Sequence, residues 1–319
     1  MTITLFCISL LLCAAYTNSN PCDPNNLRDP KTLRPDQLTV LINGYSESRI
    51  PLLQSIAATY ASSPIVSSVQ ILWGNPKTSI KILTLLSQNL SIAYPGAPIA
   101  VIRQKNDSLN SRFNPRRSIS TRAVLICDDD VETDVKSIEF AFTMWSKNRD
   151  KLIGFFGRSH DLDLINRKWM YTMHSDKYSI VLTKFMIARI EFLYFYRCGG
   201  DVAMAKAREV VDRRRNCEDI LMNFVAAEEG EGVMVVEAER VRDYGDSRNE
   251  GRSGVESVGL SSRKKDHRKR RGECITEFHR VLGRMPLRYS YGKVVRSVGE
   301  QGLCEKGGKL VPCDRQFVD

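Results

Sequence analysis

Short apolar runs recur along the first half of the chain and are typical of buried β-strands. Stretches of helical length separate them, and the first of these runs from Leu52 to Tyr60. Strands that alternate with helices favour βαβ units and a parallel, doubly wound sheet. We therefore predict an α/β fold. The strands expected from the runs are Leu38–Ile42, Val69–Trp73, Ile99–Ile102 and Val124–Cys127.

The pattern changes at both ends of the chain and in one internal stretch. Residues 1–35 combine an apolar leader with a Pro- and Asn-rich stem, and we expect the globular domain to occupy residues 36–295, followed by a tail at 296–319. Between about 229 and 272, Gly, Glu, Arg and Ser replace the apolar periodicity. A stretch that buries so little apolar surface is expected to be a mobile insertion.

The leader favours entry into the secretory pathway. Residues 1–16 are almost entirely apolar, which matches the core of a signal peptide and falls short of the roughly 20 residues that span a bilayer. No Lys or Arg precedes Arg28, so cleavage and retention as an anchor both stay open. Asn89 and Asn106 each begin an Asn-X-Ser acceptor for N-glycosylation, which agrees with a lumenal location.

The formal net charge of +10 is concentrated in one place. Residues 263–271 hold seven cations and one carboxylate, so the remainder of the chain is only mildly basic. No nucleic-acid-binding motif accompanies the run, and we exclude a nucleic acid as the partner. An anionic lipid surface or a phosphorylated head group is the better expectation.

Nine cysteines are present, two of them in the leader. Cys127 lies in an apolar run and is expected to be a buried free thiol. Cys304 and Cys313 are close enough in sequence for a zinc site, but no His accompanies them. A disulfide framework in an oxidising compartment is the simpler interpretation of the others.

Three consecutive carboxylates, Asp128–Asp130, follow the fourth predicted strand. Open α/β sheets bind ligands at the carboxyl ends of their strands. Strand alternation would direct Asp128 and Asp130 to one side and Asp129 to the other. Such close carboxylates repel one another unless a cation neutralises them, and Mg²⁺ or Mn²⁺ bridging to a diphosphate would do so. The alternative is an acidic loop that ends the strand or caps the next helix.

The triplet belongs to an ordered set of motifs that resembles the exostosin-like glycosyltransferases, from about Leu38 to about Ser290. The resemblance implies a GT-A nucleotide-sugar transferase fold with a mixed, mainly parallel sheet. It also implies a retaining enzyme with a single catalytic domain of the plant type, held in the Golgi membrane with that domain in the lumen. The motifs that carry it are Ser111–Phe113, Asp128–Asp130, Phe140–Trp145, Tyr178–Thr183, Asn216–Phe224 and Met285–Leu287.

The same resemblance assigns roles to individual residues. Asp219 is the expected catalytic carboxylate, with Glu218 as the alternative, and it would act as a nucleophile or stabilise positive charge on the sugar. Asp130 would bind Mn²⁺ or Mg²⁺, with Asp128 beside it. Cys217 and Cys274 would form a disulfide, and His160 would have a structural or acceptor-facing role. The residues expected to bind the nucleotide sugar are Arg49, Asn75, Asn110, Arg112, Asp128, Asp129 and Arg271.

The substrates are also expectations from the resemblance. The plant members that this chain most resembles use GDP-mannose and act on glycosylinositol phosphorylceramide, a membrane glycolipid. The animal members use UDP-linked N-acetylhexosamine, which is the alternative donor. A glycan-binding relative that has lost catalysis is a further alternative, and the presence of Arg112, Asp128, Asp130 and Asp219 argues against it.

Overall fold

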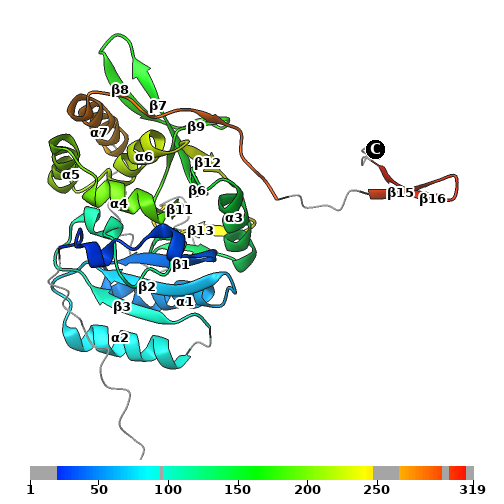
Figure 1. Cartoon of the computed structure of the whole chain (residues 1–319), viewed down its shortest axis with the longest axis horizontal. Coiled ribbons are helices and arrows are strands. Elements are labelled where there is room, and N and C mark those ends of the chain that lie inside the picture. The colour runs from blue at the N-terminus through cyan, green and yellow to red at the C-terminus, as the bar shows by residue number, and fades with distance from the viewer. Residues whose placement is uncertain (1–19, 94–95, 247–265, 297–301, 314–319) are drawn as a thin grey trace, which may run out of the picture.

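The computed structural model describes residues 20–93, 96–246, 266–296 and 302–313. A seven-stranded sheet in the order β12-β6-β11-β4-β1-β2-β3 forms its centre (Figure 1). Only β11 runs against its neighbours β4 and β6; the other pairs are parallel. The predicted α/β fold with a mainly parallel, mixed sheet is confirmed. The strands are β1 (Arg34–Gly44), β2 (Val66–Trp73), β3 (Ile99–Arg103), β4 (Thr121–Asp128), β6 (Leu152–Gly154), β11 (Phe185–Arg189) and β12 (Val233–Val235).

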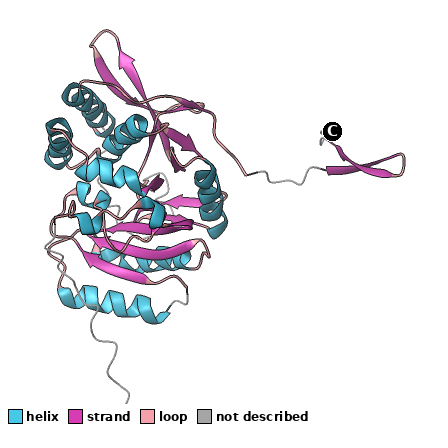
Figure 2. Ribbon diagram, in the orientation of Figure 1, coloured by secondary structure: helices cyan, strands magenta, loops and turns pink. Residues whose placement is uncertain are grey.

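Helices cover both faces of this sheet (Figure 2). Alternation along each strand supplies two separate cores, because Val40 and Ile42 of β1 pack on one side and Leu41 packs on the other. The first core is completed by α1 (Ile50–Ala61), α2 (Ile80–Ala93) and α3 (Val135–Lys147). The second is completed by α4 (Ile190–Cys198), α5 (Val202–Arg214), α6 (Glu218–Glu229) and α7 (His267–Leu282).

A three-stranded sheet, β10-β7-β8, stands beside the second core. It consists of β7 (Gly157–Asp163), β8 (Lys168–Thr172) and β10 (Ile180–Val181). Helix α7 lies along the free edge of β8, where the Trp169 N–H donates to Thr276 Oγ1 at 2.9 Å. Gly272 allows this approach, since a Cβ there would come within 2.9 Å of the Trp169 carbonyl oxygen. The helix therefore protects an edge that would otherwise offer unpaired backbone groups.

The expected mobile insertion at 229–272 is wrong at both of its ends. Val233–Val235 forms β12 at the edge of the central sheet, and β13 (Val241–Asp243) pairs with β5 (Val131–Thr133). Residues from His267 onward belong to α7. Pairing with distant strands supplies the stability that these short runs lack by themselves. Residues 247–265 lie outside the described part of the chain.

The part of the stem that the structure describes is attached to the domain. Cys22 forms a disulfide with Cys198 at the end of α4, Tyr194 donates to the Arg28 carbonyl oxygen at 3.0 Å, and Leu33 is buried. Two single-turn 3₁₀ helices, Pro24–Asn26 and Pro30–Thr32, precede β1. Within the described ranges, no helix is both long and apolar enough to cross a membrane. The apolar leader lies outside them.

The remaining short strands form two separate two-stranded sheets. β9 (Lys177–Tyr178) pairs with β14 (Ser290–Tyr291), and β15 (Gly302–Lys306) pairs with β16 (Lys309–Cys313). The second pair forms a hairpin within the predicted tail and includes the backbone of Cys304 and Cys313.

Candidate active site

The Asp triplet lies at the carboxyl edge of the central sheet, where β4 ends at Asp128 between β1 and β11. Arg112, on the 3₁₀ helix Leu109–Phe113, reaches Asp128 at 3.0 Å. Arg49, on the 3₁₀ helix Glu47–Arg49 after β1, reaches Asp129 at 2.8 Å and Asp130 at 3.1 Å. The expected alternation of side chains is therefore not seen beyond Asp128, because the strand ends there and one arginine contacts both of the next two carboxylates.

Burial and mutual repulsion set the electrostatics of the triplet. Burial raises the pKa of Asp128 and of Asp129, although Arg112 and Arg49 oppose the effect. The pKa of Asp130 rises to about 6, first because of burial and then because of the Asp128 charge. Carboxylates that still resist ionisation beside two arginines form an environment that favours an added cation.

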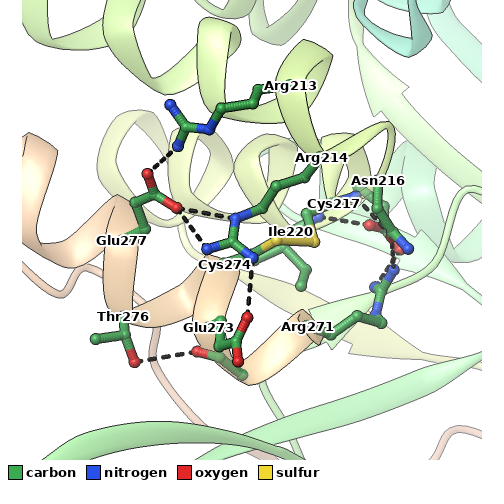
Figure 3. Close-up of a disulfide and its surroundings, with 12 residues drawn as sticks. Arg213, Arg214, Asn216, Cys217, Ile220, Arg271, Glu273, Cys274, Thr276 and Glu277 are labelled. Atoms are coloured by element: carbon green, nitrogen blue, oxygen red, sulfur yellow. Dashed lines mark hydrogen bonds and ion pairs between the residues drawn. A yellow bond between two sulfur atoms is a disulfide. The ribbon is translucent and has the colours of Figure 1, made fainter. Parts of the chain in front are cut away.

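The second half of the site is built by α6 and α7, which a disulfide joins at Cys217 and Cys274 (Figure 3). Asp219 follows Cys217 in the first turn of α6, and Arg271 precedes Cys274 by about one turn of α7. The bridge brings these two side chains together, and Arg271 Nη2 lies 2.6 Å from Asp219 Oδ2. Both side chains are only 6% exposed, so this is a buried ion pair.

Arg271 has further contacts that fix its orientation. Its Nη1 donates to Asn216 Oδ1 at 3.1 Å, and its guanidinium lies 4.5 Å from the centre of the Tyr171 ring. Burial alone would lower the pKa of Arg271, but Asp219 and Tyr171 outweigh it and raise that pKa. Asp219 therefore faces a permanent cation. Its other oxygen accepts the Ile220 N–H at 2.8 Å, and negative charge at a helix start is favourable.

Glu218, the alternative catalytic residue, joins the two halves of the site. Arg112 Nη1 lies 3.2 Å from Glu218 and 3.0 Å from Asp128, so one guanidinium bridges α6 and β4. Burial raises the pKa of Glu218 to about 7, with Arg112 opposing the shift and Asp219 adding to it. Glu218 is therefore partly protonated near neutral pH, whereas Asp219 is paired with Arg271.

This raised pKa predicts how stability varies with pH. The folded state retains a proton on Glu218 between its ordinary pKa of 4.5 and about 7, while the unfolded chain releases it. The free energy of unfolding should therefore fall as pH rises through that window, by about 1–3 kcal/mol from this group. Glu218→Gln should flatten the profile. Urea unfolding of both proteins in a chelator from pH 4.5 to 8 measures the difference, and parallel profiles would contradict the assignment.

Several residues of the site were not expected from the sequence. Lys184, just before β11, forms an ion pair with Asp243 of β13 and lowers the pKa of Asp128 and Asp130. Gly245 lies against the triplet, since a Cβ there would be 2.6 Å from Asp130 Oδ2. Asn223 hydrogen-bonds both backbone groups of Val181 and so attaches α6 to β10. Of these residues, only Asn223 lies in a sequence motif recognised beforehand.

Two of the expected nucleotide-binding residues do not join the cluster. Asn110 is 1% exposed, and its amide contacts the Tyr196 hydroxyl and the Arg208 carbonyl oxygen, so both polar atoms of its side chain have partners within the fold. Asn75 follows β2 at the same sheet edge, where its side chain accepts the Lys77 N–H at 2.9 Å.

His160 has the surroundings of a structural residue. Its Nδ1 lies 2.8 Å from Ser179 Oγ, and its ring stacks on Tyr289 at 4.8 Å. Burial lowers its pKa to about 4, so it is neutral at physiological pH.

The described residues include no group of three or more His, Cys, Asp or Glu side chains arranged to hold a metal ion on their own. The carboxylates of Asp128 and Asp130 nevertheless suit a hard cation that takes its other ligands from water and a diphosphate. Burial and, after it, the charges of neighbouring carboxylates raise their pKa values, and such a cation would offset both effects.

Comparison with known proteins agrees with this geometry. A model described as "Glycosyl transferase family 64 domain" matches residues 38–299. The chain belongs to glycosyl transferase family 64. The match spans the triplet, Arg49, Arg112, the Asp219–Arg271 pair and the disulfide that joins α6 to α7. The exostosin-like resemblance is confirmed, and this family 64 protein is a glycosyltransferase.

The relatives include plant and animal proteins. Glycosyltransferase family protein 64 C3 of Arabidopsis thaliana is 60% identical over 96% of this chain and 94% of its own length. Glycosylinositol phosphorylceramide mannosyl transferase 1 of the same plant is 29% identical over 81% of this chain and 76% of its own. Human Exostosin-2 is 29% identical over 75% of this chain, which corresponds to 32% of the exostosin.

A solved structure with some similarity is the mannosyltransferase PcManGT from Pyrobaculum calidifontis in complex with GDP-Man and Mn²⁺. It matches 71% of this chain and 63% of its own with a TM-score of 0.45 and 13% identity. The family assignment rests on the sequence matches.

Proposed function

We propose that this family 64 protein is a retaining, metal-dependent mannosyltransferase that moves mannose from GDP-mannose to the head group of glycosylinositol phosphorylceramide. The observation that carries the chemistry is the buried cluster in which Arg49 and Arg112 hold the triplet beside the Asp219–Arg271 pair. The choice of donor and acceptor is supported by the relative named glycosylinositol phosphorylceramide mannosyl transferase 1, which aligns over 81% of this chain.

In the proposed site, different residues bind the metal and nucleotide and act on the sugar. Asp130 and Asp128 would hold Mn²⁺ or Mg²⁺, which neutralises the diphosphate and improves it as a leaving group. Arg112 and Arg49 hold the carboxylates in place and partly offset the rise in their pKa values. Asn75, Asp129 and Arg271 complete the proposed nucleotide-sugar contacts.

Asp219 would act on the sugar. The bond between the anomeric carbon and the phosphate oxygen breaks with its electron pair staying on GDP, and the sugar ring becomes positively charged. A buried carboxylate held in an ion pair with Arg271 stabilises that charge or bonds to the carbon, and no solvent reorganisation is needed first. The acceptor hydroxyl forms the new bond on the same face and loses its proton to the departing phosphate oxygen.

We also propose that the protein works in the Golgi lumen as a membrane-anchored enzyme. Two disulfides support an oxidising compartment. The acceptor residues Asn89 and Asn106 are both exposed, as N-glycosylation requires.

A donor panel tests this function. The purified protein with Mn²⁺ should release nucleotide from GDP-mannose, release it faster when glycosylinositol phosphorylceramide is added, and yield an α-linked product. Consumption of a UDP-N-acetylhexosamine instead would replace the donor assignment and leave the site intact. If no nucleotide sugar is consumed but a glycan still binds, and binds equally to Asp219→Asn, the chain is a binding relative rather than an active enzyme.

A further inference from the structure

The hairpin of β7 and β8 presents apolar side chains to solvent at its end. Figure 1 shows this hairpin projecting beyond α7. At its tip, which we define as residues 162–168, Leu164 is 78% exposed, Ile165 is 93% exposed and Leu162 is 44% exposed. Five of the thirteen exposed large hydrophobic residues in the described ranges fall within residues 162–173, so this surface is concentrated rather than scattered.

Hydrogen bonds within the tip already satisfy two of its backbone donors. The Asp163 carboxylate accepts the N–H groups of Ile165 and Asn166, each at 3.0 Å, and the Asn166 side-chain amide at 2.8 Å. Satisfied donors lower the cost of moving a turn toward hydrocarbon, where water can no longer solvate them. The same bonds hold Leu164 and Ile165 outward, and neither side chain is needed for the core.

Positive charge surrounds the apolar tip. Arg167 and Lys168 are exposed within it, and an open groove of about 670 Å³ continues from it between β8 and α7. The charged residues that line the groove are five cations and three carboxylates. Arg214 already pairs with the carboxylates of Glu273 and Glu277 (Figure 3). The cations in the groove are Lys168, Arg214, Arg268, Lys269 and Arg280.

We propose that the tip docks this domain on a bilayer surface that carries phosphate-bearing head groups. Exposed aliphatic side chains flanked by Lys and Arg are what an anionic membrane interface binds. Membrane docking requires neither the sugar donor nor the acceptor, so this inference goes beyond the proposed function. Only the suggested purpose of docking, which is to reach a lipid acceptor, rests on the proposed function.

The hairpin also relates the membrane to the active site. Tyr171 of β8 lies against Arg271, and five residues of strand and turn separate Tyr171 from Ile165. Because the chain turns at residues 164–167, six steps of 3.3 Å are an upper bound, and the reactive end of the site would stand within about 20 Å of the inserted tip. A sugar on an extended head group could reach that height while its lipid stays in the bilayer.

A reporter placed at the tip tests the proposal in the full-length protein. With phosphatidylcholine vesicles that contain phosphatidylinositol and brominated acyl chains, Ile165→Trp should be quenched and its emission should shift to the blue. The matched control is Ile80→Trp, because Ile80 on α2 is 58% exposed and far from the hairpin in sequence. Relative to the wild type, which carries the same native Trp73, Trp145 and Trp169, it should show neither change, even if the apolar leader binds the same vesicles. Equal responses from both variants would overturn the proposal.

Substitutions in the tip show which of its side chains are responsible for vesicle binding. Leu164→Ser with Ile165→Ser should weaken vesicle binding by about tenfold for each side chain, and Arg167→Gln with Lys168→Gln should remove the preference for phosphatidylinositol. Ile80→Ser with Leu85→Ser is the matched control. Transfer to a water-soluble head-group acceptor should be unchanged in the tip variants, so loss of docking and loss of catalysis are separable. Tip-dependent self-association without vesicle binding would assign the surface to a second copy and overturn the membrane proposal.

Discussion

Asp219→Asn should lower turnover by about 10²–10³-fold while nucleotide-sugar affinity changes little. The carboxylate charge matters most when the sugar becomes cationic, and the amide cannot replace it. Asparagine can still accept a hydrogen bond from Arg271, which lies 2.6 Å from Asp219, so the local shape is retained. Steady-state kinetics with isothermal titration of the donor separates the two effects.

Stability must be measured alongside, because the substitution leaves a buried arginine without its counter-charge. A loss of about 3 kcal/mol is expected from such a change. Asp161→Asn is the matched control, since Asp161 pairs with Lys177 at 2.8 Å outside the cluster and should affect stability without affecting turnover per folded molecule. Glu218→Gln tests the alternative catalytic residue. A severe loss of turnover in Glu218→Gln, with normal turnover in Asp219→Asn, would make Glu218 the catalytic carboxylate in place of Asp219.

Asp130→Asn should abolish metal-dependent nucleotide binding while the fold persists. The wild type should lose activity with a chelator and regain it with Mn²⁺. Protons compete with the ion for Asp130, whose pKa is about 6, so metal affinity should fall by about tenfold per pH unit below that value. Titration of Mn²⁺ between pH 5 and 7.5, followed by the binding of GDP, measures this dependence.

Without metal, Asp130→Asn should be at least as stable as the wild type. The substitution removes one of three buried carboxylate charges that repel one another. Asp134→Asn is the control. Asp134 caps α3 by accepting the Ser137 N–H at 3.0 Å, and because Asn caps a helix about as well as Asp, this loss of one charge should change neither stability nor metal binding greatly. Full activity of Asp130→Asn in a chelator would disprove the metal assignment.

Much of the fold could be predicted because its signals are local. The apolar runs of β1, β2, β3 and β4 are long enough to identify buried strands, and the structure has all of them in the central sheet. β12 could not be recognised in the same way. Its three residues have no periodicity to read, and they become a strand only by pairing with β6. The antiparallel β11 is equally invisible in sequence, because strand direction depends on the path of the chain.

In the candidate site too, some residues could be suggested from sequence motifs and others only from the structure. Motif order suggested Arg112, the triplet, Asp219 and Arg271, and the structure brings these together. Asn110 was suggested in the same way, but the structure buries it against Tyr196, away from this cluster, which its residue type alone could not reveal. Lys184 and Asp243 gave no sequence signal, since they approach Asp130 from the start of β11 and the end of β13 only after folding.

The sequence by itself determined the buried strands and the carboxylates that end one of them, because strand length and alternation are properties of neighbouring residues. Only the tertiary structure decided which charges meet. In the basic run, Arg268, Lys269 and Arg270 stay exposed while Arg271 is buried against Asp219. That choice depends on the helical phase of α7 and on the disulfide that sets its distance from α6. Both arise from contacts between residues more than fifty positions apart, where no local pattern can encode the partner.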